Sequence, residues 1–165
     1  MSAGTARSAR GTWTRALGVT LVRTTPAAVA SDPALLRALT DGTERSATPA
    51  LPPTPDGAEW FEVRAGGVTA GVAIVQRDCP RPGEATLLAV AIAREARGRA
   101  TATHALLAAE RRLVSEGCAP MYARVPRTNG RGLYFMLRAG FTPLPAAERP
   151  SDDGDATWFA RIRSR

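Results

Sequence analysis

Residues 87–107, LLAVAIAREARGRATATHALL, change their hydrophobic period halfway along. The apolar run 87–93 predicts a buried strand, and the Arg-Gly-Arg sequence at 97–99 predicts a turn shortly after it. The apolar positions beyond the turn recur at i, i+4, i+7 and i+11, on one face of a helix: Ala102, Leu106, Ala109 and Leu113. The stretch therefore predicts a strand, a short glycine-containing turn and a helix, in that order.

A strand that leads through a short turn into a helix N-terminus is suited to binding phosphate. The first backbone N–H groups of a helix have no intrahelical partner, and the helix dipole favours negative charge there. The dinucleotide fingerprint G-x-G-x-x-G is absent, and so is the P-loop motif, since the chain contains no lysine. These absences exclude two common phosphate-binding motifs and leave the strand–turn–helix unit itself.

Two motifs narrow the interpretation. Residues 92–102, IAREARGRATA, resemble the V-x-P-x-x-R-G-x-G-x-G/A signature of the GNAT acyltransferase superfamily. Residues 129–141, NGRGLYFMLRAGF, resemble the second signature of the same family, an Asn that leads into a short helix ending in Gly-Phe. The resemblance implies an α/β GNAT fold of the α+β type, with a mixed sheet of six or seven strands and about four flanking helices.

Length and charge distribution place the chain among single-domain proteins. Its 165 residues suit one domain. We expect residues 1–12 to be a disordered Ser/Gly/Ala/Arg-rich tail and residues 13–165 to form one acyltransferase domain. Three arginines in the first fifteen residues and three in the last five leave only +1 of the +7 net charge between them. Basic tails on a nearly neutral body do not predict a nucleic-acid partner.

The sequence shows no clear motif for membrane insertion, secretion or metal binding. There is no run of 18 apolar residues and no continuous apolar region near the N-terminus, so neither membrane association nor a signal peptide is expected. Cys79 and Cys118 are too few and too far apart for a zinc site or a disulfide framework. These observations predict a cytoplasmic protein without a bound metal.

Seven consecutive residues make up the expected phosphate cradle: Arg97, Gly98, Arg99, Ala100, Thr101, Ala102 and Thr103. By resemblance this turn holds the pyrophosphate of acetyl-CoA, mainly through backbone N–H groups. The family pattern has Gly at the position of Ala100. An alanine is acceptable there if its φ is negative, and costly if the turn requires a positive φ.

Further cofactor contacts follow from the resemblance. Backbone groups of Ile92 and Ala93 would bind the pantetheine arm and polarise the thioester carbonyl. Asn129 would contact the arm, although an Asn is also an ordinary turn residue. Met136 stands where the family has a Tyr that protonates the leaving thiolate. Helix phase predicts that Met136 packs inward, and the resemblance implies that this position lies at the cofactor.

Candidate catalytic groups are few. Tyr134 is a candidate acid, but it lies two positions from Met136, roughly 200° around a helix, so we expect it to face elsewhere. The resemblance makes Glu84, at the start of the strand that leads to the cradle, a candidate base, because some members of the family use a carboxylate on this strand. A solvated turn residue is the alternative. The proline-rich segment 43–57 is expected either to lie over the acceptor cleft or to be an idle surface loop.

The resemblance implies an enzyme that moves an acetyl group from acetyl-CoA, or another acyl-CoA, to the amine of a small-molecule or peptide acceptor by direct attack. Two alternatives stay open. One is transfer involving the phosphopantetheine thioester of an acyl carrier protein, which the Ala100 substitution permits. The other is a non-catalytic domain that binds acyl-CoA. The chain is expected to act as a monomer or a homodimer.

Overall fold

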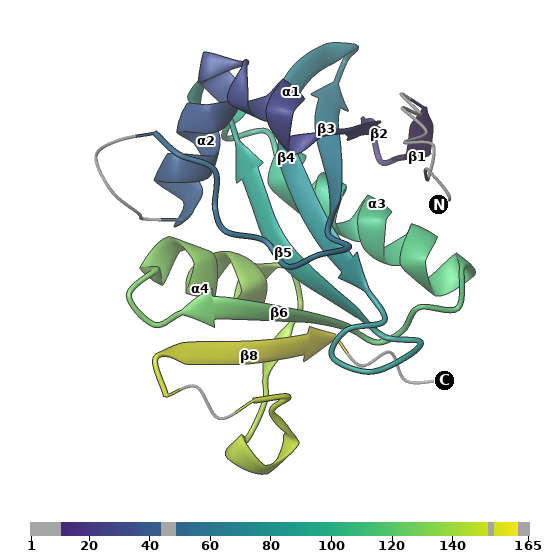
Figure 1. Ribbon diagram of the computed structural model, residues 1–165, viewed down its shortest axis with the longest axis vertical. Coiled ribbons are helices and arrows are strands. Elements are labelled where there is room, and N and C mark those ends of the chain that lie inside the picture. The colour runs from purple at the N-terminus through teal and green to yellow at the C-terminus, as the bar shows by residue number, and fades with distance from the viewer. Residues whose placement is uncertain (1–10, 44–48, 152–153, 162–165) are drawn as a thin grey trace, which may run out of the picture.

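The first half of the chain folds into antiparallel strands rich in apolar and β-branched residues. Tight glycine-containing turns join the first strand to the second and the third to the fourth, whereas two helices and the proline-rich segment separate the second strand from the third. The computed structural model describes residues 11–43, 49–151 and 154–161 (Figure 1). The strands of this half are β1 (Thr12–Ala16), β2 (Val19–Thr24), β3 (Glu59–Ala65), β4 (Val68–Arg77) and β5 (Ala85–Ile92). Each pairs with the next in an antiparallel register.

In the second half of the chain, helices connect the strands. Its elements are α3 (Thr101–Ser115), β6 (Met121–Pro126), α4 (Gly130–Arg138), β7 (Thr142–Pro143) and β8 (Ala156–Arg161). The strand order is β1-β2-β3-β4-β5-β6-β8-β7. The β5–β6 pair is parallel, which requires a crossover connection, and α3 supplies it.

The mixed α/β architecture confirms the predicted fold class, and the described residues form four α-helices and a sheet of eight strands instead of six or seven. The additional strand is β1, which begins at Thr12 and therefore overlaps the predicted disordered tail. Trp13 explains the strand, because it is 6% exposed and stacks on Phe61 with ring centroids 4.3 Å apart. Residues 1–10 of the predicted tail lie outside the described residues.

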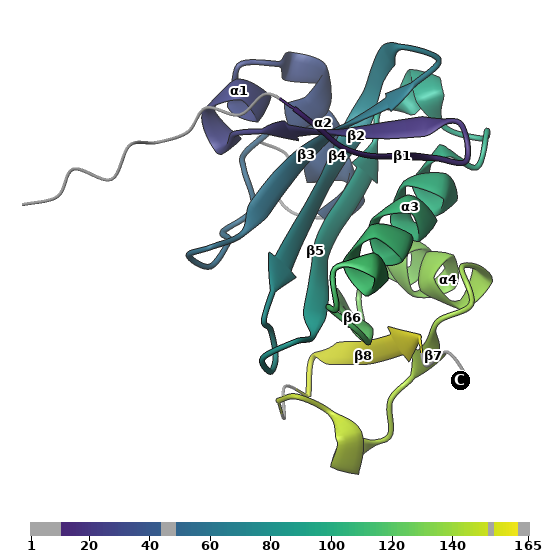
Figure 2. The same ribbon diagram turned by 90° about the vertical axis from the view of Figure 1, so that its right-hand side faces the viewer.

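Helices cover both faces of the sheet (Figure 2). One face packs against α3 and α4 around a core that includes Leu106, Met136 and Phe159. The other face packs against α1 (Pro26–Ala30) and α2 (Pro33–Thr43). Within the described ranges, none of the helices combines the length and apolar character needed to cross a membrane.

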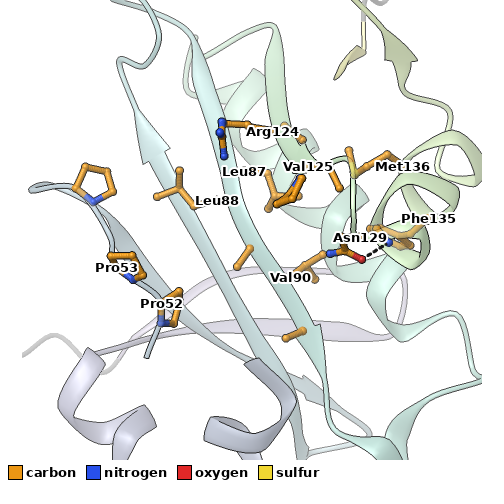
Figure 3. A pocket seen from close by; sticks show the side chains of 16 residues that line it. Pro52, Pro53, Leu87, Leu88, Val90, Arg124, Val125, Asn129, Phe135 and Met136 are labelled. Carbon is orange, nitrogen blue, oxygen red and sulfur yellow. Dashed lines mark hydrogen bonds between the residues drawn. The ribbon is translucent and has the colours of Figure 1, made fainter. Parts of the chain in front are cut away.

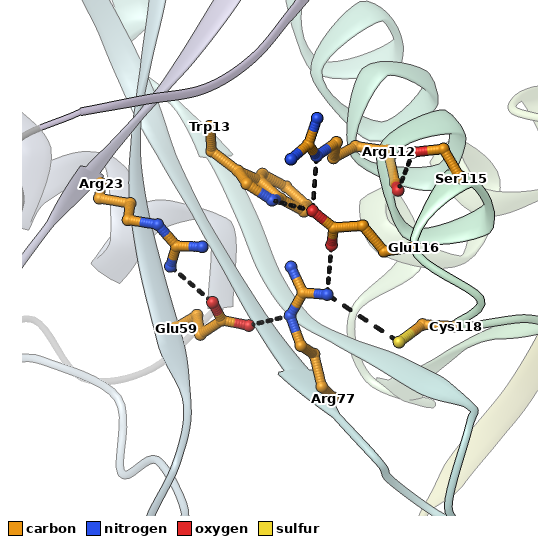
Figure 4. A network of polar contacts seen from close by, with 8 residues as sticks. All are labelled: Trp13, Arg23, Glu59, Arg77, Arg112, Ser115, Glu116 and Cys118. Carbon is orange, nitrogen blue, oxygen red and sulfur yellow. Dashed lines mark hydrogen bonds and ion pairs between the residues drawn. The ribbon is translucent and has the colours of Figure 1, made fainter.

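A polar network joins the N-terminal strands to the end of α3 (Figure 4). The Glu59 carboxylate accepts hydrogen bonds from Arg23 and Arg77, each at 2.6 Å. Arg77 also pairs with Glu116, which accepts a 2.6 Å hydrogen bond from Arg112. The network links β2, β3 and β4 to the end of α3, so the sheet and the crossover helix hold a common position.

The acid limb of the stability curve should depend on Glu116. Partial burial raises the pKa of its carboxyl, but hydrogen bonds from Arg77 and Arg112 outweigh burial and hold this pKa below its ordinary value of 4.5. A pKa lowered by folding contributes stability above the unfolded-state pKa, which is lost as the pH falls through the folded-state pKa. We therefore expect Glu116→Gln to lose less stability than the wild type between about pH 5 and pH 2.

Urea denaturation at a series of pH values measures this difference. The matched control is Glu148→Gln, since Glu148 is exposed in a short 3-10 turn, Ala146–Glu148. It should keep the wild-type dependence on pH. Parallel curves for Glu116→Gln and the wild type would show that the network does not set the acid limb.

Candidate active site

Strands β5 and β6 are paired at one end and separate toward the other. Their parallel register covers three rows, and within the described chain it ends at Leu87 and Ala123. β5 then continues to Ile92, and β6 continues to Pro126. A groove lies between the diverging strand ends (Figure 3), and we call it the split groove.

Pairing with β4 decides which backbone groups of β5 face the split groove. The Ala93 N–H donates to the Ala70 carbonyl oxygen at 2.8 Å. Because hydrogen-bonded and non-bonded pairs alternate along antiparallel strands, the backbone groups of Val90 and Ile92 point away from β4, toward β6. In agreement, the Ile92 carbonyl accepts a 2.9 Å hydrogen bond from Arg97 Nε. The Val90 backbone therefore faces the split groove, and the Ile92 backbone faces the hollow that adjoins it, whereas the Ala93 N–H belongs to the sheet.

A β-bulge interrupts β5 where β6 departs. Leu87 pairs with Val75 and Ala89 with the adjacent Ile74, so Leu88 is an extra residue in the β4–β5 register. A bulge bends the strand and leaves its extra residue unpaired in the ladder. Here the bulge is next to the last β5–β6 pair, so it shapes the narrow end of the split groove.

The walls of the split groove come from four segments and are mostly apolar. The proline-rich segment, β5, β6 and α4 supply the lining residues: Pro52, Pro53, Pro55, residues 87–91, residues 123–126, Asn129, Gly132, Phe135 and Met136. Pro52, Pro53 and Pro55 thus place this part of segment 43–57 at the groove, which argues against an idle surface loop. Residues 44–48 lie outside the described residues.

The wide end of the groove leads to the turn before α3. Gly98 and Ala100 have φ values of 80° and 58°, so the turn does require left-handed backbone where the family has glycine. Ala100 is the N-cap of α3 and makes no side-chain capping hydrogen bond. The N–H groups of residues 101–103 precede the first intrahelical donor, His104, which bonds to the Ala100 carbonyl. This helix start can therefore accept an anion.

Arg97 connects this turn to its surroundings. A second hollow, adjoining the split groove, is lined by Arg97, Ala102 and Arg131, with Asp41 from α2 opposite. Besides its bond to the Ile92 carbonyl, Arg97 is 3.4 Å from the Asp41 carboxylate through Nη2. Arg97, Arg131 and the N-terminus of α3 give this hollow a positive electrostatic potential near the turn, and the Asp41 carboxylate lies at its rim. Arg99 lies in the same turn, and Thr103 lies in the first turn of α3.

The second motif forms the wall opposite β5. Asn129 is 7% exposed, and its Oδ1 accepts a 2.8 Å hydrogen bond from the Gly132 N–H, which caps α4. A Cβ at Gly132 would lie 2.9 Å from Val125 Cγ1, so this close approach requires glycine. Met136 is 2% exposed and lines the groove, as helix phase predicts. Asn129 thus combines the capping role with a position at the groove.

Tyr134 and Glu84 are not among the described residues that line the groove. Tyr134 is 63% exposed, and its hydroxyl accepts a 3.3 Å hydrogen bond from Arg138, on the outer face of α4. Glu84 precedes β5 and accepts a 3.3 Å hydrogen bond from the Tyr122 hydroxyl. Burial, and then the nearby Glu84 carboxylate, raises the pKa of that phenol. These positions do not favour an acid or base role for either residue.

Several groove residues escaped the sequence analysis. The bulge at Leu88 has no sequence signal, because any apolar run can hold one. Phe135 is indistinguishable from a core residue by pattern alone. Arg124 is a charged residue in an otherwise apolar strand, and this break in the pattern is the one sequence feature that could have identified it as a groove residue. Among the described residues, no three His, Cys, Asp or Glu side chains gather as metal ligands.

Comparison with known proteins identifies the class that this fold and site define. A sequence model of the acetyltransferase (GNAT) family matches residues 33–141, from α2 to the residue after the Gly that ends α4. The chain belongs to the acetyltransferase (GNAT) family, which confirms the resemblance of the two motifs and the predicted enzyme class. No curated protein sequence matches the chain.

Solved structures agree with this fold. An acetyltransferase from Thermus thermophilus is 22% identical, with a TM-score of 0.64 over 88% of this chain and 97% of that one. The GNAT domain of PAT from S. lividans is 15% identical, with a TM-score of 0.66 over 90% and 96%. A Bacillus subtilis acetyltransferase in complex with CoA is 14% identical, with a TM-score of 0.59 over 86% and 95%.

The positive φ of Ala100 predicts that the cradle is under strain. An L-residue with a Cβ pays about 1–2 kcal/mol in this region, whereas glycine adopts it readily. We expect Ala100→Gly to raise the free energy of unfolding by up to about 1 kcal/mol, after allowing for the larger backbone entropy of glycine. The midpoint of urea denaturation measures the change.

Ala102→Gly is the matched control, since Ala102 lies two residues away inside α3. The same substitution in ordinary helical backbone should lower stability by roughly 0.5–1 kcal/mol. Opposite signs for the two variants identify strain at Ala100. A loss of stability in both would contradict it.

Proposed function

We propose that the protein transfers an acetyl group from acetyl-CoA to an amine, with the donor lying along the split groove. The observation that carries this proposal is the continuity between the groove and the cradle before α3. A long ligand with phosphates at one end and a reactive thioester at the other fits such a site. Solved relatives bound to CoA or acetyl-CoA support the same donor.

The edge of β5 is suited to the pantetheine arm. This arm is extended and carries two amides, so it can pair with a strand edge as an additional strand would. Val90 directs backbone groups into the split groove and Ile92 into the adjoining hollow, as the alternation from the Ala93–Ala70 bond requires. We assign the arm to these two residues. The phosphates then lie over residues 97–103, and Asn129 and Met136 form the opposite wall.

The thioester carbonyl would lie at the bulge, with the Leu88 N–H as its donor. Leu88 is the first residue beyond the last β5–β6 pair and is the extra residue in the β4–β5 register. A fixed backbone N–H at that point would stabilise the negative charge that develops on the carbonyl oxygen during attack. We thus assign the polarising role to Leu88, in place of the Ile92 and Ala93 backbone groups that the family resemblance implied.

The chemistry needs little help from side chains. The neutral amine attacks the thioester carbon, a C–N bond forms, the C–S bond breaks and the thiolate leaves with the electron pair. Met136 cannot donate a proton to that thiolate. A thiol has a pKa of about 8.5 in cysteine, so the thiolate is a tolerable leaving group, and water can carry the proton from the amine to it. Positioning and carbonyl polarisation supply the catalysis.

The cradle assignment predicts the effect of a charge at Ala102. We expect Ala102→Asp to abolish detectable CoA binding, because its carboxylate would occupy the approach of phosphate to the first N–H groups of α3. Affinity for pantetheine, which has no phosphate, should stay within about twofold of the wild type, since no phosphate contact is involved. Calorimetry with both ligands measures the two affinities.

Ala102→Ser is the control of similar size without charge, and it should bind CoA. Equal affinity of the wild type for CoA and pantetheine would refute the cradle and favour a carrier-protein arm as donor. Normal CoA binding by a folded Ala102→Asp variant would place the anion elsewhere. Binding of acetyl-CoA with no thiol release in any amine panel would favour the non-catalytic alternative.

A further inference from the structure

Within the described chain, the residues that line the split groove include a positive charge and no negative one. Of the described residues that line it, Arg124 alone carries a charged side chain. The same lining holds no carboxylate and no imidazole. An acceptor that enters as an ammonium ion therefore meets no partner of opposite charge in this lining, whereas an anionic group meets a guanidinium.

Arg124 lies at the narrow end of the groove, on the acceptor side. It is the first residue of β6 beyond the Leu87–Ala123 pair. Side chains alternate along a strand, and Ala123 belongs to the core under α3 and α4, so Arg124 is on the face that α1, α2 and the prolines cover. Figure 3 shows its guanidinium reaching from β6 toward Leu88, above the prolines.

One of the contacts of Arg124 is a solvent-exposed ion pair. Its Nη2 is 3.2 Å from the Asp155 carboxylate, and the Asp155 side chain is 83% exposed. Exposed ion pairs contribute little, because water competes with both partners. A carboxylate inside the apolar groove would interact more strongly with the guanidinium, since fewer waters screen it there. Asp155 is therefore a competitor that an anionic acceptor can displace.

We infer, on the basis of the proposed acetyl transfer, that the acceptor is a small amino acid whose carboxylate Arg124 binds. The guanidinium matches a carboxylate with two parallel hydrogen bonds, which fixes the orientation of the acceptor as well as its position. Leu88, Pro52 and Pro53 provide apolar contacts for the remainder of the molecule. The amine then lies between Arg124 and the thioester.

The same arginine helps to generate the nucleophile. Attack requires the neutral amine, and the described lining offers no carboxylate or imidazole to take its proton. A neighbouring positive charge disfavours the ammonium form, so Arg124 shifts the bound acceptor toward the reactive amine. The released proton leaves with water, and the products are the N-acetyl amino acid and free CoA thiol.

Matched acceptor pairs test this inference. Thiol release from acetyl-CoA is measured with leucine against leucinamide, methionine against methioninamide, and 4-aminobutanoic acid against 4-aminobutanamide. The carboxylate makes the α-amine more basic, so chemistry alone favours the amides at neutral pH. We expect kcat/KM for at least one acid to exceed that for its amide by about tenfold or more.

Variants assign this preference to Arg124. In Arg124→Gln the acid should lose its advantage, so that the ratio of acid to amide kcat/KM falls to one or below, and Arg124→Lys should keep part of the advantage. Asp155→Asn should lower KM for the acid and not for the amide. Arg127→Gln is the matched control, because Arg127 is an exposed arginine just beyond β6, and it should keep the wild-type ratio.

Two kinds of failure are distinguishable. Equal rates for both members of every pair would overturn this inference, and so would the absence of any turnover with these acceptors. In either case, CoA binding by the wild type would leave the proposed function standing. An Arg124→Gln variant that lowers both members equally would assign Arg124 a structural role and also overturn it. Absence of CoA binding by the folded wild type would overturn the proposed function itself.

Discussion

The structure depends on the point where β5 and β6 stop pairing. Backbone N–H and C=O groups must find partners, and continuous pairing would satisfy them and leave no site. Here the parallel register ends at Leu87 and Ala123, although both strands continue. The three paired rows keep both strands in one sheet, and β4 and β8 support β5 and β6 where these two no longer pair with each other. The edge of β5 that faces β6 is thereby left for a ligand.

The remaining elements shape that opening. α3 begins at the end of β5 through a turn with left-handed backbone, which brings the first helical N–H groups to the mouth of the groove. α4 closes the opposite wall, and its approach to β6 requires Gly132. The proline-rich segment covers the acceptor side. The ionic network at Glu59, Arg77 and Glu116 lies away from the groove lining and fixes α3 against the sheet.

Sequence patterns predicted the elements that local rules determine. The change of period around residue 97 located β5, the cradle and α3, and the Asn-to-Gly-Phe motif located α4. β1 escaped because its stability comes from Trp13 stacking on Phe61, a tertiary contact. The bulge at Leu88 and the position of Arg124 escaped because both depend on register between strands. Register determines which backbone and side-chain groups face the groove, so the reacting end of the site could not be assigned from one sequence.

Residue-resolved hydrogen exchange with CoA tests the central claim most directly. If the pantetheine arm pairs with the free edge of β5, CoA should slow exchange of the Val90 and Ile92 amides and of the amides of residues 101–103. Pantetheine should slow exchange at Val90 and Ile92 and leave residues 101–103 unchanged, because it lacks the phosphates. Binding of CoA that protects other amides, and leaves Val90 and Ile92 exchanging as in the free protein, would contradict the account.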